Sequence, residues 1–181
     1  MNSQTHTTQN LFKQPVFIAK IAVSLLVSVL GLTALVGWYT ANQTLIQILP
    51  SFAPMQFNTA IGFLLCGIGL SFAAFNFRKV SLWVGIALVT LGILTILQYM
   101  LGVDFGIDEL LMEAYITVKS SHPGRMAPNT ALCFALFGVG LVAYSLDTKL
   151  KITLLVSGIG GIVTALAIVV LYGYLSNIPD L

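Results

Sequence analysis

Five long apolar stretches, separated by short polar segments, constrain this chain more than any other feature. They run over residues 21–39, 59–77, 80–101, 130–146 and 152–175, and none contains an ionised side chain. Each is close to the roughly 20 residues that a helix needs to cross a bilayer. Because backbone polar groups in lipid must be satisfied within the segment, such stretches form helices. The sequence therefore predicts an all-α, polytopic membrane bundle of five transmembrane helices in a single membrane domain, residues 1–181.

The distribution of charge predicts the orientation of these helices. Only 8% of the residues are charged, whereas soluble domains carry about 25%. Six basic residues fall on one side of the membrane: Lys13, Lys20, Arg78, Lys79, Lys149 and Lys151. The positive-inside rule then predicts a cytoplasmic amino terminus, with residues 1–15 as a polar cytoplasmic tail, and a periplasmic carboxyl terminus in a bacterial inner membrane. The small net charge of +2 argues against a nucleic-acid partner.

A short motif occurs twice, as "MQFNTAIGF" at residues 55–63 and "MAPNTALCF" at residues 126–134. The match continues, with a shift of two, through Gly92 with Gly161 and Thr95 with Thr164. We interpret this as an internal repeat of two-helix units with the same orientation, residues 55–102 and 126–175. Two crossings per unit place both motifs on the outer face, where they can converge.

The paired motif residues have two interpretations. Asn and Thr are favoured helix N-caps, and capping is the local role that we favour for Asn58 and Asn129. Helix N-termini also offer donors to an anionic or carbonyl group of a ligand, and Met is a soft lining for an apolar ligand. The candidate ligand-binding residues are Met55, Asn58, Thr59, Arg125, Met126, Asn129 and Thr130.

The outer loop over residues 103–125 has an amphipathic pattern. Ile107, Leu110, Leu111 and Ala114 recur at helical spacing, which predicts a short helix on the outer leaflet or over the end of the bundle. The earlier outer loop, residues 41–54, predicts a short turn of helix. No catalytic residue, metal site or cofactor is predicted.

Three charged residues of the longer outer loop are further candidates. Asp104 and Asp108 fit either a metal or acid/base pair or a solvated, cap-forming pair, and we favour the second because no further ligands accompany them. Arg125 can hold an anionic ligand or pair with one of these acids, and pairing is favoured.

Small residues inside the apolar stretches indicate close helix packing. They include Gly62, Gly67, Gly69, Gly138, Gly140, Gly158, Gly160 and Gly161. The first stretch has a similar stripe, Ser24, Ser28 and Gly31, which serves either packing within the chain or dimerisation. Cys66 and Cys133 lack metal-site spacing and are interpreted as small buried hydrophobic residues.

Three segments resemble a known family: "GVDFGIDELL", "PGRMAPNTALCFALFGVGL" and "PMQFNTAIGFLLCGIGL". Together they resemble the multi-span N-terminal membrane sensor region, of the MASE type, in bacterial PAS-linked sensor histidine kinases and diguanylate cyclases. The resemblance covers residues 38–175. It implies an input module for two-component or cyclic-di-GMP signalling that acts as a dimer. Because such proteins continue into a further span and cytoplasmic output domains, it also implies that this chain is a fragment of a longer protein.

The leading prediction is therefore a non-enzymatic sensory input module that detects an apolar or amphipathic small molecule, or the state of the bilayer. Its expected partners are the lipid bilayer and a second copy of the chain. One alternative is a structural or assembly subunit of a membrane complex. Another is a small carrier, which is disfavoured because the spans hold only Thr95, Gln98 and Thr164 as polar candidates, and these are expected to form interhelical hydrogen bonds.

Overall fold

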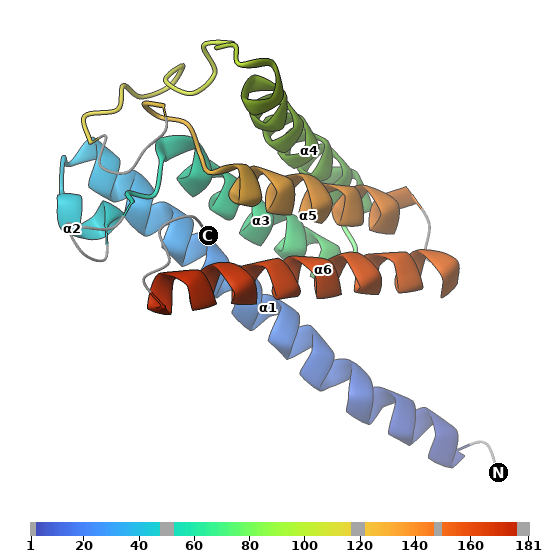
Figure 1. Ribbon diagram of the computed structural model, residues 1–181. Helices are drawn as coiled ribbons and strands as arrows, with labels where there is room; N and C mark the ends of the chain where they lie inside the picture. Colours follow the sequence, from blue (N-terminus) through green and yellow to red (C-terminus); the bar gives the residue numbers. More distant parts are fainter. Residues whose placement is uncertain (1–2, 48–52, 117–121, 147–149, 177–181) are drawn as a thin grey trace.

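The computed structural model describes residues 3–47, 53–116, 122–146 and 150–176. The described residues form helices and loops, with no strand. The helices are α1 (Ser3–Tyr39), α2 (Gln43–Ile46), α3 (Phe57–Ala74), α4 (Arg78–Leu101), α5 (Pro128–Leu146) and α6 (Leu150–Leu175) (Figure 1). Residues 1–2 of the expected tail and 117–121 of the expected outer loop lie outside the described residues.

Five of these helices are long and apolar enough to cross a membrane: Gln14–Tyr39 within α1, α3, α4, α5 and Thr153–Gly173 within α6. This confirms the all-α class and the five predicted spans, and the chain is a multi-pass membrane protein. The first helix is longer than predicted. It starts at Ser3, so most of the expected polar tail is helical and projects beyond the other helices (Figure 1). Helical backbone hydrogen bonds form within the segment and do not require an apolar environment.

The helices pack in an order that differs from their order in the chain. α1 lies along α3, and α4 lies along α5, while α3 also contacts α4 and α5. Among the described elements, α6 contacts only α5. We call the end where α1 and α4 finish and α3 and α5 begin the loop end, and the opposite end, near Arg78, the turn end.

Glycines allow two of these helix pairs to approach closely. A Cβ atom added to Gly67 of α3 would lie 2.6 Å from the carbonyl oxygen of Ser24 in α1. A Cβ atom added to Gly138 of α5 would lie 2.6 Å from the carbonyl oxygen of Gly85 in α4. Because Cβ atoms do not approach backbone this closely, larger residues would push the helices apart. The small-residue stripe of α1 therefore serves packing within the chain.

The other predicted packing glycines fall into two groups. A Cβ atom on Gly62 would clash with Phe134, and one on Gly69 would lie 2.5 Å from Leu141 Cδ1, so both are close-packing positions as predicted. A Cβ atom on Gly140 would make only an ordinary contact, at 3.9 Å from Ile159. Gly158, Gly160 and Gly161 have open space around the added atom, so the prediction of close packing is wrong for them within the described part of the chain.

Of the two loops at the loop end, one has the helix predicted from the sequence and the other does not. The predicted short turn of helix is present as α2, where the side chain of Asn42 accepts a hydrogen bond from the Thr44 N–H at 3.1 Å. The predicted amphipathic helix is absent from residues 102–116, which form turns and bends. Leu110 and Leu111, expected on its buried face, are 74% and 62% exposed.

Candidate functional site at the loop end

Residues 102–116, which we call the crossing loop, extend from the end of α4 across the loop end toward α1 and α2 (Figure 1). The crossing loop is attached at two places. One is a buried polar cluster around Asp108, and the other is an aromatic contact around Tyr115. Both attachments involve residues that lie far apart in the sequence.

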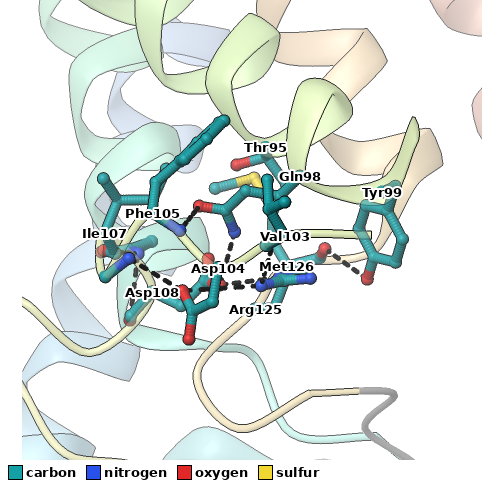
Figure 2. Close-up of polar contacts among 12 residues, drawn as sticks. Thr95, Gln98, Tyr99, Val103, Asp104, Phe105, Ile107, Asp108, Arg125 and Met126 are labelled. Atoms are coloured by element: carbon teal, nitrogen blue, oxygen red, sulfur yellow. Dashed lines mark hydrogen bonds and ion pairs between the residues drawn. The ribbon is translucent and has the colours of Figure 1, made fainter. Parts of the chain in front are cut away.

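Asp108 is the centre of the first attachment. Its Oδ2 atom accepts hydrogen bonds from Gln98 Nε2 of α4 and from Arg125 Nε, each at 2.6 Å (Figure 2). Asp108 and Arg125 are only 5% and 4% exposed, and Gln98 is fully buried. The structure therefore confirms the predicted pairing of Arg125 with an acid, and the prediction of a solvated Asp108 is wrong.

Burial makes this ion pair sensitive to its surroundings. An ionised group away from water is stable only when it is paired and hydrogen-bonded. Arg125 Nη2 also lies 3.5 Å from the carbonyl oxygen of Val103, and its guanidinium carbon lies 5.5 Å from the centre of the Tyr99 ring. The second acid, Asp104, is 3.7 Å from Arg125 Nη2 but largely exposed, so that pair contributes little.

Asn58 connects the first motif to the backbone of the crossing loop at Asp108. Its Nδ2 atom donates to the backbone carbonyls of Ile107 and Asp108, at 2.9 and 3.1 Å. The N-cap of α3 is Gln56, and Asn58 lies in the first helical turn, so the predicted capping role of Asn58 is wrong. We refer to Asn58, Gln98, Asp108 and Arg125 as the Asp108 cluster.

The same hydrogen bonds explain why the crossing loop is not helical. In a helix, the carbonyls of residues 107 and 108 would accept from backbone N–H groups four residues later. Here they accept from Asn58, and the Asp108 side chain turns inward to Arg125. Short amphipathic helices are marginal without tertiary packing, so these long-range contacts determine the conformation.

The second motif has a different local environment. The side-chain oxygen of Asn129 accepts from the neighbouring Thr130 N–H at 2.8 Å, and both residues are half-buried. Asn129 lies in the first turn of α5, which begins at Pro128, and is not placed before the helix as an N-cap would be. Thr59, the partner of Thr130 in the sequence match, is buried in α3. The structure thus joins Asn58, Asp108 and Arg125, whereas Asn129 and Thr130 form a local contact.

The two motif methionines are held mainly by packing and backbone contacts. Met126 is 1% exposed, and its carbonyl accepts from the Tyr99 hydroxyl at 3.1 Å. Met55 is half-buried; its carbonyl accepts from Trp38 Nε1 at 2.9 Å, and its N–H donates to Ile46.

Tyr115 forms the second attachment of the crossing loop. Its ring lies edge-on to Trp38 of α1, with centroids 4.7 Å apart, and its hydroxyl donates to the carbonyl of Gly37 at 3.3 Å. The neighbouring Ile116 packs with Trp38, Ile46 and Phe57. Desolvation raises the pKa of the Tyr115 hydroxyl above its ordinary value.

Sequence reasoning did not assign Gln98 to the site. It was expected to form an interhelical hydrogen bond, but it bonds to Asp108 of the crossing loop, and its Oε1 atom accepts from the Phe105 N–H at 3.4 Å. The only sequence signal that could have assigned Gln98 to the site was the presence of a glutamine in the last turn of a predicted span. Thr95 and Thr164, grouped with it, donate to carbonyls four residues earlier in their own helices.

The Asp108 cluster is a buried ion pair that also receives amide donors from α3 and α4. Within the described ranges, no three His, Cys, Asp or Glu side chains are grouped so that they could hold a metal ion. No known protein family, curated protein or solved structure matches the chain. The fold and the site define a multi-pass helical membrane protein with a buried ion pair under a crossing loop.

Proposed function

We propose that this chain is a sensory input module of the bacterial inner membrane, with the loop end in the periplasm and the amino terminus in the cytoplasm. It detects an apolar or amphipathic small molecule, or the state of the bilayer, and acts without catalysis. The observation that carries the proposal is the Asp108 cluster, which couples one loop to α3, to α4 and to the segment that leads into α5. The family resemblance adds the homodimer and the cytoplasmic output domain to the proposal.

The stimulus would act first on the crossing loop. Leu110 and Leu111 are exposed beside Asp108, where they can enter the interfacial layer of the bilayer or contact an amphipathic molecule. A displacement of this segment pulls on Asp108 and on the carbonyls that Asn58 holds. It therefore acts on α3, α4 and the start of α5 together.

The buried ion pair makes the response two-state. Separating Asp108 from Arg125 would leave both charges poorly solvated, so intermediate positions of the crossing loop are unfavourable. A stimulus shifts the populations of attached and detached states only by its difference in affinity for them. A difference of a few kcal/mol in binding free energy changes these populations measurably. About 5.5 kcal/mol would convert a 1:99 ratio of the two states to 99:1.

Close packing would carry the change to the turn end. Helices that touch backbone to backbone through Gly67 and Gly138 move as rigid units, because their interfaces leave no room for gradual deformation. At the turn end, the hydroxyl of Tyr144 in α5 donates to the carbonyl of Ala73 in α3 at 2.9 Å and lies 3.0 Å from Asn76 Oδ1. A shift of α5 relative to α3 therefore reaches the side proposed to be cytoplasmic.

The test measures a distance across the turn end in the full chain. Spin labels are attached at Phe75→Cys and Leu146→Cys, both exposed positions, after Cys66→Ala and Cys133→Ala. The protein is diluted with unlabelled chain and placed in vesicles of short-, medium- or long-chain phosphatidylcholine, with or without oleate. We expect two distance populations whose ratio depends on the lipid or on oleate.

The variants connect this response to the Asp108 cluster. Asp108→Asn should move the ratio toward the detached population without oleate, while Glu113→Gln, an equal charge change at an exposed position of the same loop, should leave it unchanged. A single distance that stays constant across every lipid, oleate and Asp108→Asn would refute the sensing proposal.

A second function, an assembly subunit, is favoured by one observation. α6 contacts only α5 and leaves its remaining surface uncovered by any described element. Purification from native membranes distinguishes the two, because an assembly subunit would retain a partner at constant stoichiometry and would show no response to oleate or lipid length.

A further inference from the structure

The exposed charges at the loop end are acidic. In its described residues, 102–116 and 122–125, four acids accompany a single arginine, Arg125. Arg125 is only 4% exposed and is already paired with Asp108 at 2.6 Å. The other three acids, Asp104, Glu109 and Glu113, are all exposed. A ligand that approaches this surface therefore meets negative charge, while the arginine lies beneath it.

Asp104 has a carboxylate that the protein engages only in part. Its side chain is 69% exposed, and its Oδ1 atom lies 3.7 Å from Arg125 Nη2, too far for a strong ion pair (Figure 2). The same oxygen accepts a hydrogen bond from the Gly106 N–H at 2.8 Å. Its Oδ2 atom has no partner among the residues that the structure describes. The carboxylate can therefore pair with an external cation without breaking a strong contact.

The position of Asp104 relative to the membrane adds an apolar surface. Leu101 is the last residue of the span formed by α4, and Asp104 follows three residues later. Leu101, Val103 and Phe105 are 62%, 41% and 44% exposed. Residues just beyond the end of a span lie in the interfacial layer of the bilayer, together with the headgroups. An amphiphile in the bilayer therefore brings its headgroup to Asp104 and its chain to these apolar side chains.

The segment around Asp104 can adjust to such a ligand. Gly102 and Gly106 flank it with φ angles of +64° and +68°, and a Cβ atom added to either meets nothing within 4 Å. The hydrogen bonds that join the segment to Gln98 and Arg125 are 3.4 and 3.5 Å long, beyond the usual range. The segment can therefore move without breaking the buried ion pair.

We propose that Asp104 and the apolar side chains beside it bind a cationic amphiphile, a molecule with a positively charged headgroup and an alkyl chain. Charge complementarity selects this class, because an anionic headgroup would be repelled by the exposed acids and a neutral one would gain no attraction from Asp104. The proposal rests on the sensing function proposed above, since it names the class of molecule that is detected. The bound cation takes Asp104 from Arg125 and adds positive charge beside the guanidinium, which weakens the attachment of the crossing loop.

The test measures binding to the full chain in phosphatidylcholine nanodiscs. A bimane label at Met100→Cys, 76% exposed in the last turn of α4, reports on the site after Cys66→Ala and Cys133→Ala. The probes are dodecyltrimethylammonium, dodecyl sulfate and dodecyl maltoside, which have the same chain and differ in charge. The same label at Phe75→Cys, an exposed position of the turn end, measures the effect of amphiphile dissolved in the bilayer.

We expect dodecyltrimethylammonium to half-saturate the signal at Met100→Cys at about one fifth of the mole fraction that the other probes require, as for an exposed ion pair. At Phe75→Cys no preference for the cation is expected. The preference should disappear in about 1 M salt, where the Debye length falls to about 3 Å. Equal half-saturation by the three probes, or tighter binding of dodecyl sulfate, would overturn the proposal.

Two variants decide whether Asp104 itself is the site. Asp104→Asn should abolish the preference for the cation, whereas Glu113→Gln, an equal loss of charge farther along the crossing loop, should retain most of it. Thermal unfolding verifies that both variants fold. Equal losses in the two variants would overturn the site in favour of a general attraction to the acidic loop end.

Binding and sensing can fail independently in these experiments. A preference for the cation together with a constant distance across the turn end would refute sensing and leave the site standing. A distance ratio that responds to oleate or to lipid length, while the three probes bind equally, would refute the cationic site alone.

Discussion

The starts of α3 and α5 share the Asn-Thr-Ala sequence but connect to the rest of the molecule differently. Asn58 is buried and donates to two carbonyls of the crossing loop, whereas Asn129 bonds to the adjacent residue. The second start contributes through Arg125, which occupies the place that Pro54 has before the first motif. Both starts nonetheless meet at Asp108, one at its backbone carbonyl and the other at its carboxylate.

The difference separates what a repeated sequence specifies from what it does not. The packing faces of the two starts are equivalent, because Ala60 with Gly67 and Ala131 with Gly138 receive α1 and α4 through corresponding atoms. The polar contacts are not equivalent, because a single crossing loop passes over both starts and meets each from a different side. Three sets of substitutions test this distinction.

The largest effect is expected from Arg125→Gln. It leaves Asp108 as a buried charge without its ion-pair partner, which costs about 3–5 kcal/mol of unfolding free energy. The measurement is denaturant-induced unfolding in detergent micelles, with Arg78→Gln, at an exposed arginine of the turn end, as the control. A loss below about 1 kcal/mol would mean that Asp108 does not depend on the second start. Adding Asp108→Asn to Arg125→Gln should recover part of the loss.

Substitution of the paired glycines tests the equivalence of packing. Gly67→Val and Gly138→Val should each cost about 1–3 kcal/mol or more, because the new side chain overlaps the backbone of α1 or α4. The same unfolding measurement applies, and Gly160→Val, which has open space, is the matched control. Clearly unequal losses at the two positions would show that the two interfaces are not equivalent.

The smallest effect distinguishes the two asparagines. Asn58→Ala should cost about 1–2 kcal/mol, because the carbonyls of Ile107 and Asp108 lose their donor. Asn129→Ala should change the unfolding free energy by no more than about 0.5 kcal/mol, as expected for a half-buried residue with one local hydrogen bond. Hydrogen exchange of the crossing loop should rise only with Asn58→Ala. Equal effects of the two substitutions would contradict the asymmetry described above.

Much of the fold could be predicted from the sequence, and part of the site could not. The pairing of Arg125 with an acid was predictable, since the outer loop that ends at Arg125 contains four acids and only one other basic residue, Lys119. The role of Asn58 was not, because an asparagine at a helix start fits a cap equally well until the position of residues 107 and 108 is known. The crossing loop was wrongly predicted as a helix for the same reason. The spacing of its apolar residues gives no sign that Asn58 of α3 donates to its backbone carbonyls and so competes with helical hydrogen bonds.

The sequence by itself determined the number and apolar character of the membrane helices, because these depend on the hydrocarbon thickness and on hydrogen bonds within each segment. Tertiary structure decided which helices pair and which acid is buried. α1 meets α3, α4 meets α5, and Asp108 leaves water, because backbone contacts at glycines and a buried ion pair join residues that are distant in the chain. Such contacts depend on three-dimensional proximity, which local sequence patterns do not encode.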